Sequence, residues 1–254
     1  MRNVVTIARK ELQGYFASPI AYVVIGFFAL LFGYFFYTFL YFFERQSMQM
    51  APGMGTPLNV NQALIGPAFM NVSVIVLFVM PMITMRSYAE EKRSGTMELL
   101  LTSPLTDLQI ILGKFFGALA LYALMLAVTL IHIAVLFLYG SPEWKPVATG
   151  YLGLLLMGSC FISAGLFISS LTKNQIVAGM ISFAVFLMLW VINWLGQSMG
   201  PTGQAIVTHL SITDHLDDFA RGIIDTKHLV YYLSFIVFGL FLTAKSVDSE
   251  RWRG

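Results

Sequence analysis

Six long stretches of this chain contain no Lys, Arg, Asp or Glu, and this pattern constrains the fold more than any other feature. The stretches cover residues 12–43, 46–85, 115–142, 146–172, 174–213 and 228–244. Each is long enough to cross the hydrocarbon core of a bilayer, which takes roughly 20 residues of helix. The sequence therefore predicts an all-α integral membrane protein. Its six transmembrane helices are expected at about residues 20–43, 62–85, 115–140, 147–171, 175–198 and 228–244.

Composition supports this class and leaves no room for a large soluble domain. Hydrophobic residues make up 57% of the chain and charged residues only 11%, which lies far from the balance of soluble proteins. We therefore expect residues 1–254 to form a single transmembrane domain. The net charge of +2 is small, and no basic patch indicates binding of nucleic acid.

The orientation follows from the positions of Lys and Arg. If the spans alternate in direction, eleven of the 15 basic residues fall on one side, which also holds both termini. Basic residues in short loops are retained in the cytoplasm. Both termini and the link at residues 86–114 are thus predicted to be cytoplasmic, and residues 199–227 extracytoplasmic.

The link at residues 86–114 is a charge-dense segment with helix punctuation. Gly95 can end one helix, and Thr96 can cap a short helix from Met97 to Thr102. Pro104 closes that helix, and Thr106 with Gln109 matches a capping box that opens the next. Such a segment predicts a folded docking element between two membrane spans.

Two further helices are predicted outside the spans. Residues 2–17 have an apolar face beside Arg9 and Lys10, which is typical of a helix in the membrane interface, and Ser18-Pro19 begins the first span. Between spans five and six, Thr213 can cap a helix with a shared apolar face. We expect this second helix to rest on the outer membrane surface. Its apolar residues are Leu216, Phe219, Ala220 and Ile223.

No motif for nucleotide binding or catalysis is evident. Gly113-Lys114 is followed by Phe115, and Leu108 stands where a phosphate-binding loop needs its first glycine. No nucleophile stands beside a base, so the chain is predicted not to be an enzyme and to carry no cofactor. ATP-driven work would come from another polypeptide docking at residues 86–114.

The sequence around this link resembles a known family. The run Glu90-Glu-Lys-Arg-Ser-Gly-Thr-Met-Glu-Leu-Leu-Leu-Thr-Ser-Pro104, followed by Gly113-Lys114, is similar to the first cytoplasmic loop of ABC-2 type transporter permeases. Ala8-Arg-Lys-Glu-Leu12 and the order of the spans also resemble that family. His215-Leu-Asp-Asp-Phe-Ala-Arg-Gly222, with Tyr231-Tyr232, looks most similar to its gliding-motility-associated branch.

This resemblance implies a permease subunit of an ATP-binding-cassette exporter in the bacterial inner membrane. Its partners would be an ABC ATPase, which binds ATP and Mg, a second identical or related permease subunit, membrane lipid and an extracytoplasmic accessory protein. The implied coupling helix docks on the ATPase. The implied docking residues are Glu90, Glu91, Lys92, Arg93, Gly95, Thr96, Met97, Glu98, Leu99, Leu100, Leu101, Thr102 and Ser103. The interfacial helix, with Arg9, Lys10, Glu11 and Leu12, would lean on the same motor.

Polar residues within the spans have two interpretations. Such groups often mark a substrate path, but hydrogen bonding between helices is the more common reason. The residues concerned are Asn71, Ser73, His132 and Asn193. No metal site is predicted, because successive residues of a short helix diverge in direction and cannot all coordinate one ion. The residues Asp214, His215, Asp217 and Asp218 are instead expected to form a solvated acidic face.

Two other functions remain open at the level of sequence. The same membrane unit could transmit force to a partner in a motility or envelope complex. An ATP-independent carrier or channel is a further alternative, although the spans lack the acidic and basic residues of an ion relay. Transport of a defined solute would separate the first alternative from an exporter.

Overall fold

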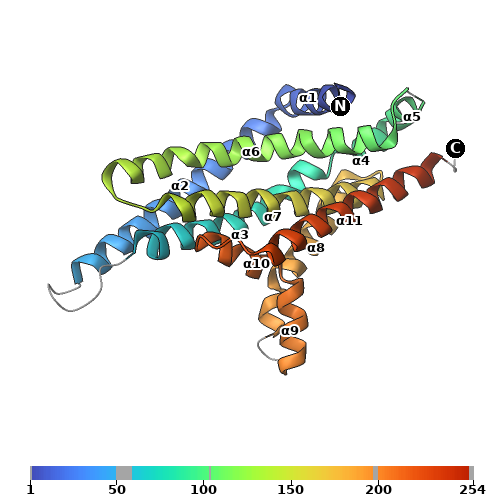
Figure 1. Ribbon diagram of the computed structural model, residues 1–254. Coiled ribbons are helices and arrows are strands. Elements are labelled where there is room, and N and C mark those ends of the chain that lie inside the picture. Colours follow the sequence, from blue (N-terminus) through green and yellow to red (C-terminus); the bar gives the residue numbers. More distant parts are fainter. Residues whose placement is uncertain (1, 50–58, 103, 197–199, 252–254) are drawn as a thin grey trace.

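The computed structural model describes residues 2–49, 59–102, 104–196 and 200–251, and every regular element in these ranges is helical (Figure 1). The long helices are α2 (Pro19–Gln49), α3 (Gly66–Thr84), α6 (Asp107–Tyr139), α7 (Trp144–Ser170), α8 (Gln175–Gly196) and α11 (Thr226–Arg251). The shorter elements are α1 (Arg2–Ala17), the π-helix η1 (Asn61–Ile65), α4 (Ala89–Ser94), α5 (Thr96–Leu101), α9 (Pro201–Leu210) and α10 (Ile212–Ala220).

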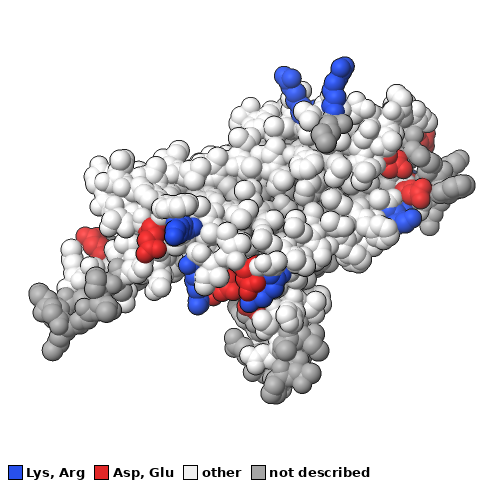
Figure 2. All heavy atoms as spheres, in the orientation of Figure 1, with Lys and Arg blue, Asp and Glu red and all other residues white. Residues whose placement is uncertain are grey.

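Six segments are long and apolar enough to cross a membrane, which confirms the predicted fold class. Figure 2 shows charged atoms in separate groups, with wide uncharged surface between them. The observed helices run further than the predicted spans in places. Helix α2 continues past Phe43 to Gln49, and α11 begins at Thr226 and ends at Arg251.

The core is built around α7 and α3. In the most apolar window of α7, 72% of residues are buried, against 22% in α2 and 17% in α8. Helices α3, α10 and α11 all pack on α7. The peripheral helices α2, α8 and α11 therefore supply most of the apolar surface that lipid or another subunit must cover.

Glycines along α7 allow this close packing. A Cβ at Gly158 would lie 2.1 Å from Cε1 of Tyr122, and one at Gly165 would lie 2.3 Å from Oγ1 of Thr84. Such distances leave no room for a side chain. The same device fixes α1 on α6, because a Cβ at Gly113 would meet Ile7 at 2.5 Å and one at Gly117 would meet Glu11 at 2.7 Å. The Gly113-xxx-Gly117 pattern thus serves packing within the chain.

Candidate functional site

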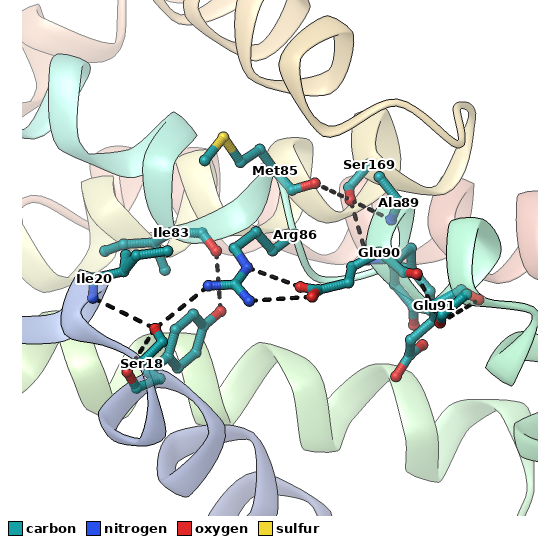
Figure 3. Close-up of polar contacts among 12 residues, drawn as sticks. Ser18, Ile20, Ile83, Met85, Arg86, Ala89, Glu90, Glu91 and Ser169 are labelled. Atoms are coloured by element: carbon teal, nitrogen blue, oxygen red, sulfur yellow. Dashed lines mark hydrogen bonds and ion pairs between the residues drawn. The ribbon is translucent and has the colours of Figure 1, made fainter.

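The end of the molecule that holds α4 and α5 is called the inner end, and the end that holds α10 the outer end, after the predicted orientation. At the inner end, α3 is joined to α4 by a short break that α7 stabilises (Figure 3). Helix α3 ends at Thr84 and α4 begins at Ala89. The hydroxyl of Ser169 accepts hydrogen bonds from the backbone N–H groups of Tyr88 and Ala89, both at 3.1 Å, and donates to the Met85 carbonyl at 3.0 Å. The end of α7 therefore caps the start of α4.

Arg86 connects this break to the start of α2. Its guanidinium makes two bonds to the carboxylate of Glu90, at 2.8 and 3.2 Å, and a third to the hydroxyl of Ser18 at 3.4 Å (Figure 3). Tyr15 lies beside it and donates to the Ile83 carbonyl at 3.0 Å. Burial raises the pKa of Tyr15, so the phenol keeps its proton and remains a donor. The junction of α1 and α2 is thereby fixed to the end of α3.

Lys114 is the centre of a buried ion-pair network. Its side chain is only 2% exposed, and its ammonium lies 2.8 Å from Oε1 of Glu11 on α1 and 2.7 Å from Oε1 of Glu91 on α4. It also lies over the ring of Tyr88, 5.1 Å from the centroid. A buried ammonium needs such partners, because an unpaired charge in the interior is costly. One residue of α6 therefore holds α1 and α4 together.

Lys92 forms the third connection of α4. Its side chain is 5% exposed, and its ammonium donates to the Ser170 carbonyl and to Oε1 of Glu250 near the end of α11. The residues expected around the docking element thus divide into two groups. Glu90, Glu91 and Lys92 contact the protein's own helices, whereas Arg93 is exposed.

Helix α5 follows α4 at an elbow formed by Gly95. This residue has a φ of 74°, a left-handed conformation that favours glycine. Met97 is buried at 6% exposure, while Leu99 is 72% exposed and Thr96, Glu98 and Thr102 are also exposed. Ser103 and the side chains of Leu100 and Leu101 lie outside the described residues. One face of α5 therefore anchors it, and another presents Glu98 and Leu99 to the exterior.

After α5 the predicted capping box is present, whereas Thr96, expected to cap the short helix, is the first residue of α5 and its hydroxyl contacts the Ser94 hydroxyl and the Glu91 carbonyl. The Thr106 hydroxyl accepts from the backbone of Gln109, and the Gln109 side chain accepts from the backbone of Thr106, so the capping box opens α6 as expected. In Figure 1, α5 lies at one extreme of the molecule, beyond α4 and near the chain's C-terminal end.

Helix α1 presents the four predicted residues on different faces. Arg9 and Lys10 are exposed, whereas Glu11 pairs with Lys114 and Leu12 packs against the core. Val5, expected on the apolar face, is 66% exposed, because the face packed on α6 is centred on Ile7 and Glu11. The helix therefore follows the glycines of α6 more closely than its own sequence pattern suggests.

Two of the polar residues in the spans border one cavity. Asn71 and Ser73 line a cavity of about 430 Å³ between α3, α8 and α10, together with Trp190 and Trp194. The Ser73 hydroxyl accepts from Nε1 of Trp190 at 3.3 Å and donates to the Met70 carbonyl. Oδ1 of Asn71 is buried without a protein partner. This cavity thus brings two of the four polar residues together with two indole rings.

The other two polar residues do not join that cavity in the described structure. His132 belongs to α6 and faces α2. Its ring contacts the rings of Phe32 and Phe36 edge-on, and its Nδ1 is buried without a partner. Gly33 makes room for it, since a Cβ there would lie 3.3 Å from Nε2 of His132. The side chain of Asn193 lies outside the described residues.

The outer segment differs from the prediction in three respects. Its helix α10 is capped by Ser211, whose hydroxyl accepts from the Asp214 N–H at 3.3 Å, and not by Thr213. An additional helix, α9, precedes it and projects from the bundle (Figure 1). Helix α10 does not lie on the surface of the bundle, because Leu216 and Phe219 are fully buried against α7 and α3, whereas Ile223 is 52% exposed.

The expected solvated acidic face is also only partly present. Asp217 pairs with Arg221 at the surface, but His215 is 5% exposed and Asp218 bonds to His228 on α11 at 2.6 Å. Burial lowers the pKa of His215; its hydrogen bond to the His209 carbonyl opposes this effect, and the charges of His228, His209 and Lys227 add to it. The outer end therefore contains a buried histidine pair that the sequence pattern did not indicate.

Comparison with known proteins identifies the family. The family model described as "ABC-2 family transporter protein" matches residues 5–244. The chain belongs to the ABC-2 transporter family. The chain is also 33% identical over 104 residues to the "Probable multidrug ABC transporter permease YbhR" of Escherichia coli K12, and equally to that of Escherichia coli O157:H7. This alignment spans 41% of the chain and 28% of each relative.

Several residues that hold the inner end of this ABC-2 chain were not found by sequence reasoning. They are Tyr88, Ser169, Ser170 and Glu250. Ser169-Ser170 stands at the predicted inner end of span four, and paired hydroxyls at a span end are a weak signal for a cap. No comparable local signal marks Glu250 as the partner of Lys92.

Proposed function

We propose that this chain is the permease subunit of an ATP-binding-cassette exporter in a bacterial inner membrane. Two such subunits, identical or related, would work with two separate ATPase subunits that bind ATP and Mg. Both termini and the 86–114 link would face the cytoplasm, and the ATPase would dock on α5. The family match over residues 5–244 supports the transporter assignment.

The observation that carries the docking proposal is the contrast between the two faces of α5. Glu98 and Leu99 are exposed, and Leu99 leaves an apolar side chain 72% accessible at the end of the molecule. An exposed leucine beside a carboxylate fits an interface with an apolar centre and a charged rim. The buried Met97 on the opposite face ties the helix to its own bundle.

The contacts of α4 give this docking helix a mechanical role. A push on α5 would pass through Gly95 to α4, whose side chains reach α6 through Glu91, the α2 start through Glu90 and Arg86, and α11 through Lys92. Ion pairs buried in this way resist separation because breaking one leaves an uncompensated charge. We therefore infer that ATP-driven closure of the motors displaces several spans together. Helix α1, with Arg9 and Lys10 exposed, is proposed to lean on the same motor.

The cargo path is proposed to pass the cavity at Asn71 and Ser73. Its walls combine two indole rings with a buried amide oxygen that has no protein partner, which suits an amphipathic compound. The partial relative named as a probable multidrug permease is consistent with such a cargo. Neither the family match nor this relative singles out the gliding-motility branch, and that assignment stays a prediction.

Affinity purification of the tagged chain from its native membrane tests the docking proposal. The wild type should retain a soluble ATPase at a stoichiometric level, and Glu98→Arg should reduce that recovery at least tenfold. Glu44→Arg is the matched control, because Glu44 is an exposed residue near the C-terminal end of α2. This variant should leave the recovery of the ATPase unchanged. Equal recovery with all three chains would place the docking surface elsewhere.

A further inference from the structure

The junction between α10 and α11 contains a buried pair of histidines. His215 of α10 and His228, the third residue of α11, are each 5% exposed. Their Nδ1 atoms contact each other, and the ring of Tyr231 lies 3.9 Å from the ring of His215, centroid to centroid. Because the two buried rings touch each other, their ring N–H groups must be donated to the contacts that the rings themselves make.

The outer nitrogen of each ring also has a partner. Nε2 of His228 lies 2.6 Å from Oδ2 of Asp218, and Nε2 of His215 lies 3.3 Å from the carbonyl oxygen of His209. A carboxylate and a carbonyl only accept hydrogen bonds, so both Nε2 atoms must donate. Together with the Nδ1–Nδ1 contact, three contacts each require one proton. Two neutral imidazoles supply only two.

The third proton belongs to His228 on physical grounds. Burial lowers the pKa of His215, which favours its neutral form, and with Nε2 donating to His209 its Nδ1 becomes an acceptor. His228 then donates from both nitrogens, to His215 and to Asp218. An imidazole that donates twice is an imidazolium, and the Asp218 carboxylate compensates its charge at 2.6 Å.

We propose that His228 is a proton-binding site at the outer end of the molecule, and that its bound proton fastens α11 to α10. When the proton leaves, the two rings keep two N–H groups for three contacts, so one of the contacts to Asp218, between the rings or to the His209 carbonyl must be given up. The released proton passes to solvent beside Asp218, whose side chain is 32% exposed. The junction therefore tightens on acidification and loosens as the proton is lost.

Some of the other ionisable groups near the pair favour the imidazolium form of His228, and others oppose it. On the α10 side and the turn before α11, the carboxylates of Asp218 and Asp225 favour the imidazolium. Lys227 opposes it but is itself paired with Asp225 at 3.1 Å. Further ionisable side chains from α9, α11 and α7 complete the surroundings. The ionisable residues around the pair are His209, Asp218, Asp225, Lys227, Tyr231, Tyr232 and Cys160.

The position of α10 gives this proton a structural consequence. Thr213 and Asp214 line the cavity that holds Asn71, and Asp217 and Arg221 line a second polar cavity of about 600 Å³ beside η1. Loosening of α10 would change the wall of both. That the proton comes from outside the cell rests on the proposed orientation, whereas the titration itself does not depend on the proposed function.

Histidine ring nitrogens can be observed directly in the full chain. The protein has four histidines, so labelling with ¹⁵N-histidine in nanodiscs gives four ring systems, assigned by single His→Gln variants. Between about pH 5 and about pH 8, we expect His228 to change from doubly to singly protonated. His215 should stay neutral throughout, with its shifts following the His228 titration. A neutral His228 over the whole range, or a doubly protonated His215, would overturn the proposal.

Variants and hydrogen exchange extend this measurement. His228→Gln cannot titrate, so the His215 shifts should lose their pH dependence, and Asp218→Asn should move the His228 titration to lower pH. His209→Gln is the control, since it keeps the backbone carbonyl that accepts from Nε2 of His215 and removes only an exposed side chain, so the His228 curve should keep its form. The hydrogen-exchange rate of the α10 backbone amides, corrected for the intrinsic rate, should rise as the wild type loses the proton. In His228→Gln the corrected rate should show no pH-dependent step. An identical step in that variant would contradict the link to α10, and if the variant does not fold, the wild-type and Asp218→Asn titrations alone decide.

Discussion

The two ends of this molecule bury polar clusters of different chemistry. At the inner end, Lys114 joins Glu11 and Glu91 with a side chain that is 2% exposed. At the outer end, His215 and His228 join α10 to α11 at 5% exposure each. Ammonium and carboxylate groups remain charged throughout the physiological pH range, whereas imidazole changes its charge there. The comparison suggests a permanent connection at the end proposed to meet the motor and a titratable one at the other.

Loss of the central ammonium should be the strongest way to break the inner cluster. In Lys114→Met, the carboxylates of Glu11 and Glu91 stay close together without a counter-charge, although both side chains are 20% exposed. We expect the free energy of unfolding to fall by roughly 3 kcal/mol, the lower end for a broken buried pair. Thermal unfolding in detergent measures this, with the exposed Lys145→Met as the control. A change no larger than that of the control would show that the network is unimportant for stability.

A smaller effect is expected when α1 is pushed away from α6. In Gly117→Ala, the new methyl group would lie 2.7 Å from Cβ of Glu11 and 3.1 Å from the Ala8 carbonyl oxygen, which displaces the carboxylate from Lys114. Overpacking of this kind costs about 1–3 kcal/mol. Gly14→Ala is the matched control, because nothing lies within 4 Å of its added methyl group. It should leave stability unchanged or raise it slightly, and similar losses in both variants would refute the close-packing explanation.

The outer cluster should reveal itself in pH dependence. Burial lowers the pKa of His215 in the folded chain, so below the ordinary value of about 6.5 the unfolded chain takes up a proton that the folded residue resists. The contribution of His215 to stability is thus complete at higher pH and declines as pH falls from that value toward the folded pKa. In a His228→Gln background, which removes the opposing contribution of the His228 proton, the chain with His215 should lose up to about 1.4 kcal/mol per pH unit in that window relative to the chain with His215→Asn. Parallel curves for the two proteins would contradict the lowered pKa, and Lys114→Met should not alter the slope.

The smallest effect is expected from an exposed pair at the same outer end. Asp217 and Arg221 are one turn apart on α10, with side chains 40% and 64% exposed. Such pairs contribute little, because solvent screens them and ordering two long side chains costs entropy. Asp217→Asn should change stability by less than about 0.5 kcal/mol in thermal unfolding. A larger loss would mean that charge near α10 matters beyond the histidine pair.

Local signals in the sequence were sufficient for some of these features. The six spans follow from apolar length, the elbow at Gly95 from its need for a left-handed backbone, and the start of α6 from the Thr106 and Gln109 capping box. Each depends on residues that are neighbours along the chain, so one sequence contains the information. The fold class, the Gly95 elbow and the capping box of α6 could therefore be predicted before the structure.

The ion-pair network could not be predicted in this way. Lys114 stands just before the predicted third span, but its partners lie 103 and 23 residues away, and only the packing of α1 and α4 beside α6 brings them together. The prediction for the outer segment, residues 199–227, failed for a related reason. Residues before Ser211 continue an apolar stretch that has no charge to separate span five from α9, so Thr213 was taken as the cap and Ser211 was missed.

The glycines of α7 also have a consequence for biosynthesis. This helix leaves the ribosome after α3 and α6, yet the surfaces of Tyr122 and Thr84 are shaped to receive Gly158 and Gly165. Helices α3 and α6 must therefore wait in the bilayer without this partner. A nascent chain that ends at Tyr139 should be a loose set of inserted helices and a substrate for quality-control proteases, whereas one that reaches Leu171 should already resist them. For this protein, the decisive step of assembly therefore takes place when α7 is inserted, midway through translation of these residues.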